Sequence, residues 1–247
     1  METTYIEIDS PDKHLSDVLE EIPSNVILYK TLTGIGATYS EIKAQRHSII
    51  IEPNVPVIIG KCNSDKHKND NLLGVYEGVT TDRIIKYLGA SRGKYYKILT
   101  TPESFTKVKD AFLIFNGKIY NTCFLLIDEA HKTIKDVDYR SDIVLPMNDF
   151  FKFKGKALVS ATPLKFSDPR FEENGFSIIK IEPTYDYAKE IDIKPSTNIL
   201  REVWEEFGWM PFITGQDKDR PFFIFINSVG IIYSIISQLK LFDKSSV

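Results

Sequence analysis

The alternation of short β-branched runs with segments of helical length is the feature that most restricts the fold of this chain. Strands that alternate with helices form βαβ units around a mostly parallel sheet. One run, "CFLLI", is apolar at every position, which is typical of a central strand that helices cover on both faces. The sequence therefore predicts an α/β fold, and its expected strands are "NVILY" from Asn25, "SIIIE" from Ser48, "YKILT" from Tyr96, "CFLLID" from Cys123, "KALVS" from Lys156 and "SIIKIE" from Ser177.

Helices are expected between these runs, and the alternation is interrupted once. The residues from 181 to 198, "IEPTYDYAKEIDIKPSTN", hold turn-forming residues and two prolines, and a polar loop and the apolar run "FFIFI" come later. We therefore expect a first α/β lobe over 1–182, a linker over 183–198 and an incomplete second lobe over 199–247. The expected helices begin after Gly36 and around "NVPVIIGK", and lie at 81–88, 102–111, 197–207 and 229–241.

Composition and charge exclude several classes of protein. Hydrophobic residues make up 43% of the chain and the net charge is -3, so we expect a globular protein whose nucleic-acid contacts, if any, are local. Cys62 and Cys123 lack paired spacing, which argues against a disulfide framework or a zinc site. The start is acidic and polar, unlike a signal peptide, and the apolar stretch from Phe222 is interrupted by polar residues. We expect a cytoplasmic protein that has no membrane contact.

The segment "LLIDEAHK", residues 125–132, ends an apolar strand with two carboxylates. Ligands of open α/β folds bind at the carboxyl ends of parallel strands, where Asp128 and Glu129 would lie. Asp128 is suited to hold Mg²⁺, and Glu129 is suited to polarise an attacking water. Ala130 and His131 complete the motif D-E-A-H, so the pair is more than a chance strand end.

A glycine-containing turn follows the strand "NVILYK" and leads into an expected helix. Such a turn is typical of a phosphate-binding loop, in which backbone N–H groups surround phosphates and a hydroxyl reaches Mg²⁺. The hydroxyl here would be that of Thr38. By itself the pattern is weak, because glycines before a helix are common in tight turns, and its position upstream of D-E-A-H strengthens it. The candidate nucleotide-binding residues are Thr33, Gly34, Ile35, Gly36, Ala37 and Thr38.

A third motif, "LVSATPL" at residues 158–164, lies on the next expected strand, about thirty residues after D-E-A-H. Ser160, Ala161 and Thr162 would come at the end of that strand, within reach of the carboxylates. We expect them, with His131, to relay the state of a bound nucleotide.

In this order and spacing the three motifs resemble those of the superfamily 2 helicases of DEAD/DEAH type. The resemblance covers about residues 20–182 and implies that they form a first RecA-like lobe with a P-loop NTPase fold. "IIIEPNVPVI" and "TTPESF" are similar to motifs Ia and Ib of that family, and "FFIFINSV" is similar to the first strand of its second lobe. The resemblance implies ATP and Mg²⁺ as cofactors and DNA or RNA as partner, contacted through the backbone of a single strand. The residues that it implies for this contact are Pro53, Asn54, Thr100, Thr101, Pro102 and Glu103.

Two departures from the family pattern leave the activity open. Ala37 stands where the family has a lysine, which removes a charge-assisted contact to phosphate worth about 1.5–3 kcal/mol. Lys30, just before the loop, is either an ordinary strand-end lysine or a substitute for it, and Lys43 is expected to point away. Beyond "FFIFINSV" no segment supplies the arginine finger of the second lobe, so we expect a fragment or a chain that uses a partner's second lobe.

Two functions follow as alternatives. The first is an ATP-dependent helicase or translocase that remodels nucleic acid, with Asp128 and Glu129 as its catalytic pair. The second is a degenerate helicase-like module that binds nucleic acid or a partner protein without hydrolysing ATP. The intact carboxylates favour the first function, and Ala37 favours the second.

Overall fold

The computed structural model describes residues 1–32, 34–135, 147, 149–162, 168–186, 201 and 229–238. The chain divides into two compact units, Met1–Tyr187 and Ala188–Val247. In the second unit, helix α12 (Val229–Gln238) begins at the predicted residue. The predicted strand at 222–226 and, apart from Arg201, the predicted helix at 197–207 lie outside the described residues. The domain boundaries at 182 and 198 stay predictions.

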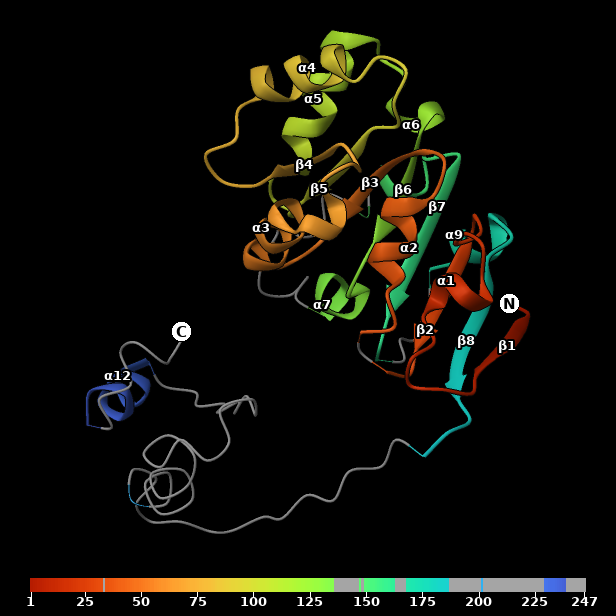
Figure 1. The fold of residues 1–247 in the computed structure, drawn as a ribbon. Coiled ribbons are helices and arrows are strands. Elements are labelled where there is room, and N and C mark those ends of the chain that lie inside the picture. The colour runs from red at the N-terminus through yellow and green to blue at the C-terminus, as the bar shows by residue number, and fades with distance from the viewer. Residues whose placement is uncertain are drawn as a thin grey trace. The chain divides into compact units, whose positions relative to one another are not determined.

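The first unit is built around one sheet in which the eight described strands are all parallel (Figure 1). The strand order is β1-β8-β2-β7-β6-β3-β5-β4. All six predicted strands are confirmed, and the two edge strands, β1 and β4, were not predicted. The strands are β1 (Thr3–Ile8), β2 (Val26–Lys30), β3 (His47–Ile51), β4 (Leu72–Val75), β5 (Lys97–Thr100), β6 (Cys123–Ile127), β7 (Gly155–Ser160) and β8 (Ser177–Pro183).

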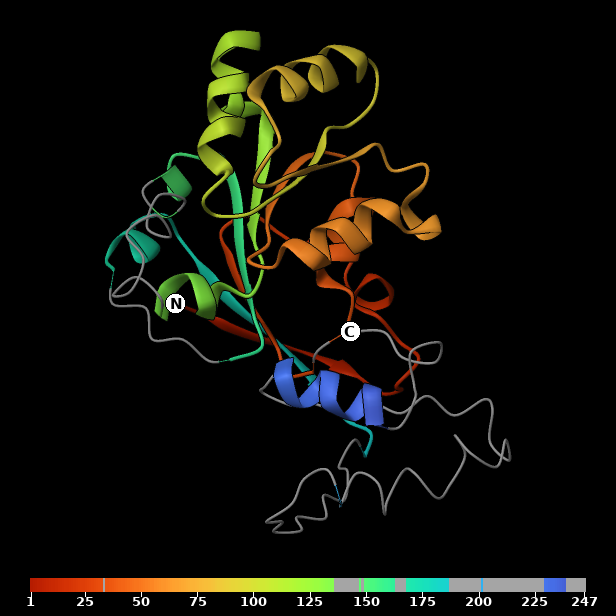
Figure 2. The same cartoon turned by 90° about the vertical axis from the view of Figure 1, so that its left-hand side faces the viewer.

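Helices cover both faces of the sheet (Figure 2). Successive strand residues point to opposite faces, so Ile49 and Ile51 belong to one hydrophobic cluster and Ile50 to the other. One face packs against α1 (Leu15–Val18), α2 (Ala37–Lys43) and α3 (Val55–Asn63). The other packs against α4 (Thr81–Ala90), α5 (Phe105–Phe115), α6 (Ile119–Thr122) and α9 (Arg170–Glu173). The remaining described helices of this unit are η1 (Asp65–His67) and α7 (Ala130–Lys135).

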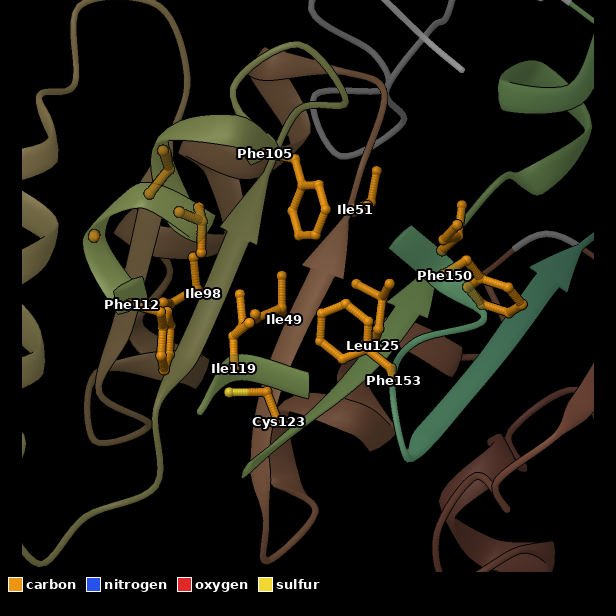
Figure 3. Close-up of a cluster of buried hydrophobic side chains, with 14 of the residues drawn as sticks. Ile49, Ile51, Ile98, Phe105, Phe112, Ile119, Cys123, Leu125, Phe150 and Phe153 are labelled. Carbon is orange, nitrogen blue, oxygen red and sulfur yellow. The ribbon is translucent and has the colours of Figure 1, made fainter. Parts of the chain in front are cut away.

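Aromatic side chains fill the second of these layers (Figure 3). Phe105 and Phe112 of α5, with Phe150 and Phe153, lie on Ile49 and its strand neighbours and are almost fully buried. Each such side chain stabilises the fold by about 1.5–3 kcal/mol relative to an exposed one. This packing holds the central strands rigidly, and with them the residues that follow their ends.

The predicted helices of the first unit are confirmed, with shifted boundaries: α4 ends at Ala90 instead of residue 88, and α5 ends at Phe115 instead of residue 111. The helix expected over 102–111 begins at Phe105, because residues 101–104 form a turn in which the Ser104 N–H donates to the Thr101 carbonyl. Since all strands run in the same direction, the segments that follow them emerge at the same edge of the sheet. Strands β2, β7, β6, β3 and β5 are consecutive neighbours, so the three sequence motifs end side by side.

Candidate functional site

The turn between β2 and α2 has the geometry that its glycines predict. Gly34 and Gly36 have φ angles of 83° and 86°, in the left-handed region that favours glycine. The Leu15 N–H of α1 donates to the Ile35 carbonyl at 2.8 Å, which ties the turn to the N-terminal segment. α2 then begins at Ala37. Thr33 lies outside the described residues.

The two carboxylates follow β6 directly. The Asp128 N–H donates to the Ile51 carbonyl of the neighbouring strand at 2.9 Å, and Asp128 is buried. Glu129 has a φ of 50°, an uncommon conformation for a residue with a side chain, and its N–H donates to Asp128 Oδ1 at 2.9 Å. A strained backbone of this kind costs about 1–3 kcal/mol and is typical of functional sites. The strain therefore coincides with the predicted catalytic residue.

A hydrogen bond joins the loop to the carboxylates. The Thr38 hydroxyl donates to Asp128 Oδ2, and both side chains are buried. Two residues that are 90 positions apart in sequence thus bring a hydroxyl and a carboxylate together, and their role as metal ligands stays a prediction. Hydroxyl and carboxylate oxygens are the ligands that Mg²⁺ prefers.

Lys30, the last residue of β2, supplies a cation to the same cluster. Its Nζ lies 3.0 Å from Asp128 Oδ1 and 2.8 Å from Glu129 Oε1, and the residue is only 7% exposed. Since β7 lies between β2 and β6, the lysine side chain spans the end of an intervening strand. Of the two readings that the sequence left open, the structure supports that of a site lysine.

The charges of this cluster stabilise one another. Burial alone would raise the pKa of Asp128, but Lys30 and the Thr38 hydroxyl outweigh it and hold the pKa below its ordinary value. Burial alone would lower the pKa of Lys30, but Asp128 and Glu129 outweigh it and raise the pKa. Both groups are therefore charged at neutral pH.

His131 and Ser160 connect the carboxylates to β7. His131 Nδ1 lies 3.3 Å from Glu129 Oε2 and 3.2 Å from Ser160 Oγ. The Ser160 hydroxyl also donates to the Thr162 carbonyl at 2.7 Å and accepts from the Thr162 N–H at 3.1 Å. Ala161 lies between them, half-buried. Within the described residues, Ser160 thus meets the histidine of D-E-A-H rather than a carboxylate.

Two further charged residues lie beside the cluster and were missed from the sequence. Glu52 follows β3 and is buried, with its Oε2 3.8 Å from Lys61 Nζ of α3. Burial and the nearby charge of Asp128 raise the pKa of Glu52, while burial lowers the pKa of Lys61 despite the attraction of Glu52. The one signal in the sequence was position: Glu52 directly follows a central strand, and Lys61 lies on the helix after it.

The residues expected to contact nucleic acid follow β3 and β5 at the same edge. Pro53 and Asn54 are half-buried, Glu103 is exposed, and the remaining three are buried. Any contact through Thr100, Thr101 or Pro102 would therefore involve backbone atoms or a movement of the loop. These assignments stay predictions.

Two basic, aromatic segments have structural explanations. In residues 89–98, the Tyr96 ring stacks on His47 with centroids 4.2 Å apart, just before β5 begins, so this part lies at the opposite edge of the sheet from Asp128. In residues 150–156, Phe150 and Phe153 belong to the core, and Lys156 Nζ donates to the Phe153 carbonyl at 3.1 Å. Neither segment adds to the site.

A pocket adjoins the phosphate-loop turn. It is a partly open hollow with a volume of about 70 Å³, and Gly34 and Ile35 of the turn form part of its wall. His14 and Tyr185 add rings, and Lys13 adds a cation. The other lining residues are Ile8, Pro11, Leu32, Ile181 and Pro183. The lining thus combines apolar side chains with polar groups, a combination that small-molecule sites also have.

The oxygens of Thr38 and Asp128 fit a Mg²⁺ ion that a bound phosphate would also coordinate. The part of the chain that the structure describes has no group of three or more His, Cys, Asp or Glu side chains able to hold a metal by themselves. Mg²⁺ usually binds through one or two carboxylates plus substrate phosphates and water. The oxygens of Thr38 and Asp128 would fit an incomplete site of that kind.

Comparisons with known proteins identify the fold and nothing finer. No protein-family model and no curated protein matches the chain. No helix among the described residues is long and apolar enough to span a membrane. Similarity is found only among solved structures, and all of those reported below are helicases or DEAD box proteins by name.

The DUF1998 helicase MrfA superposes with a TM-score of 0.50 at 12% identity, over 90% of this chain and 36% of that one. A hypothetical ATP-dependent RNA helicase from Sulfolobus tokodaii gives a TM-score of 0.44 at 16% identity, over 64% of this chain and 48% of that one. A DEAD box protein from Methanococcus jannaschii gives 0.42 at 18% identity, over 88% and 59%. The chain thus spans less than two thirds of each of these proteins. The parallel sheet and the likeness to MrfA show that the fold is α/β and of the helicase-like RecA kind, as the sequence predicted.

Proposed function

We propose that this chain binds Mg·ATP at the carboxyl edge of its sheet and hydrolyses it, as a DEAD/DEAH-type helicase-like lobe that remodels nucleic acid. The observation that carries the proposal is the convergence of Thr38, Asp128, Glu129 and Lys30 from three separate segments into one charged cluster. A purely structural sheet edge has no need of two carboxylates at one strand end, one of them on a strained backbone.

Each residue of the cluster has a chemical role in this proposal. The turn at Gly34 and Gly36 would bring backbone N–H groups to the phosphates, and Thr38 and Asp128 would hold Mg²⁺ through their oxygens. Bound Mg²⁺ would neutralise charge that develops on the phosphates. Glu129 would accept a proton from the attacking water, and its contacts with Lys30 and His131 hold its carboxylate in place.

The pocket beside the turn supports a nucleotide rather than a bare phosphate. The rings of His14 and Tyr185 and the apolar side chains around them suit a flat heterocycle. Since Gly34 and Ile35 form part of its wall, a base in the pocket would place its phosphates over the turn. We assign the pocket to the base of ATP.

The link to nucleic acid runs through neighbouring strand ends. Segments 53–54 and 100–103 follow β3 and β5 at the edge that also carries Asp128, so a strand bound there would lie beside the nucleotide. His131, between Glu129 and Ser160, would transmit the nucleotide state to β7 and the segment after it. In this proposal a second lobe, in this chain or from a partner, closes on the same edge.

Phosphate release from Mg·ATP, measured with and without single-stranded DNA and RNA, tests the proposal. We expect Glu129→Gln to abolish release while nucleotide still binds, because the amide keeps the shape of the side chain and removes its basicity. Glu173→Gln, at an exposed position of α9, is the matched control and should release phosphate as the unaltered protein does. Equal turnover in the Glu129 and Glu173 variants would refute the assignment of the base.

The second candidate function rests on Ala37, which leaves the phosphate loop without a lysine of its own. On this alternative the lobe is a degenerate module that binds nucleic acid or a partner protein without hydrolysis. Strand binding that is unchanged by ATP, together with no phosphate release by the unaltered protein, would favour it.

A further inference from the structure

We propose that Lys30 contacts the phosphates of the bound nucleotide, in place of the lysine that the phosphate loop lacks. This inference rests on the proposed function, and it assigns a catalytic residue that the family pattern puts elsewhere. It follows from three observations on the positions available for a cation near the loop.

The usual position of the lysine is closed to a charged side chain. Ala37 is 3% exposed and belongs to the hydrophobic cluster that includes Ile35 and Ile42. A lysine there would bury its stem and charge in a packed apolar layer, which costs free energy unless the charge is paired. The loop itself therefore offers no room for the cation in this conformation.

The next lysine along the chain is already bound elsewhere. Lys43, at the end of α2, has its Nζ 2.7 Å from Asp70 Oδ2 and 3.3 Å from the Lys66 carbonyl. Lys43 is the last residue of α2, whereas the turn precedes the first residue, so the two lie at opposite ends of the helix, as the sequence predicted. It is thus directed away from the turn and its phosphates.

Lys30, in contrast, ends the strand from which the loop starts, and its ammonium group is already among the site residues. Its contacts to Asp128 Oδ1 and Glu129 Oε1, at 3.0 and 2.8 Å, place it where Mg²⁺ and the attacked phosphate would meet the protein. The flexible stem of lysine allows the ammonium group to change partners without moving the strand.

A change of partner is what a bound nucleotide would require. If Thr38 and Asp128 held Mg²⁺ through their oxygens, Asp128 would no longer need the lysine as its counter-charge. Lys30 would then exchange Asp128 for a phosphate oxygen and keep Glu129. The charge-assisted bond formed in this way is of the strong kind and would act directly on the phosphate that is transferred.

The competing interpretation makes Lys30 only a counter-ion of the carboxylates, which Mg²⁺ displaces. The two interpretations predict opposite effects of Lys30 on the affinity for nucleotide. A phosphate ligand strengthens nucleotide binding, whereas a displaced counter-ion competes with Mg²⁺ and weakens it.

Calorimetric titration with ATP and ADP, each in the presence of Mg²⁺ and of EDTA, distinguishes the two interpretations of Lys30. The variants are Lys30→Met, which keeps the length of the side chain, and Lys30→Gln, which also keeps a donor for Asp128 if the first variant fails to fold. Lys43→Ala is the matched control, and circular dichroism confirms the fold of each. We expect both Lys30 variants to weaken ATP binding by roughly 10- to 100-fold, and ADP binding less.

We also expect the loss to persist in EDTA, because the contact is made to phosphate and not through the metal. Binding of ATP by Lys30→Gln that equals or exceeds that of the unaltered protein would overturn this inference alone. Failure of the unaltered, folded protein to bind ATP would overturn the proposed function with it.

Discussion

The burial of Lys97 predicts how the free energy of unfolding changes with pH, and by how much. This lysine, the first residue of β5, is 2% exposed, and its Nζ donates to the carbonyls of Glu41 and Ala44, both at 2.7 Å, and to Ser48 Oγ at 3.0 Å. It thereby fastens the end of α2, the helix that follows the phosphate loop, to the sheet. Burial lowers the pKa of Lys97 to about 8, although Glu41 opposes the change.

The sign of the pH dependence follows from that pKa. In the unfolded chain the pKa is near 10.5, so between pH 8 and 10.5 the unfolded chain binds a proton that the folded protein has released. The free energy of unfolding therefore rises with pH in this window, by about 1.4 kcal/mol per pH unit. Between pH 7.5 and 9.5 the contribution of Lys97 is a rise of about 2 kcal/mol.

Urea unfolding of the unaltered protein and of Lys97→Met at pH 7.5, 8.5 and 9.5 measures this contribution. The difference in unfolding free energy between the two should grow with pH, because the variant lacks the titrating group. The raised pKa of Cys123, about 12, lowers stability above pH 9 in both proteins and cancels in the difference. Lys43→Met, at a partly exposed position of α2, is the control and should run parallel to the unaltered protein. A difference for Lys97→Met that does not change with pH would refute the reasoning.

Further predictions concern packing and thiol reactivity. Gly155→Ala should lower the free energy of unfolding by about 1–3 kcal/mol in urea titrations, because its Cβ would lie 2.9 Å from Phe124 Cδ2. Gly89→Ala, in α4 with open space around it, should instead raise stability by about 0.5–1 kcal/mol, and a loss there would show that the helix is not as described. A thiol reagent should modify Cys62 in the native protein and Cys123 only after denaturation, since burial raises the pKa of Cys123 to about 12, and rapid reaction of both thiols would contradict the buried placement.

The central sheet was predictable because its strands are continuous apolar runs. β6, with every residue buried, can be recognised from "CFLLI" alone. The two edge strands were missed for the opposite reason. Only Ile8 of β1 is buried, and β4 is short and contains Gly74. A strand with only one neighbour needs no continuous apolar run.

The arrangement of the candidate site was predictable where a motif marks its residues. Thr38, Asp128 and Glu129 come together as the spacing implied, because parallel strands bring their ends to one edge. Lys30 remained ambiguous, because a lysine at a strand end is ordinary and only the order β2-β7-β6 brings it to the carboxylates. Glu52 and Lys61 were missed because no short motif marks them.

Nucleotide binding by the cluster is best measured by calorimetric titration of the unaltered protein with Mg·ATP, beside Thr38→Ala, Asp128→Asn and the control Lys43→Ala. We expect saturable binding that both site variants weaken and that the control leaves unchanged, because Thr38 and Asp128 together would hold the metal. No binding at millimolar nucleotide by a protein whose circular dichroism shows it to be folded would contradict the claim that this cluster is a nucleotide site.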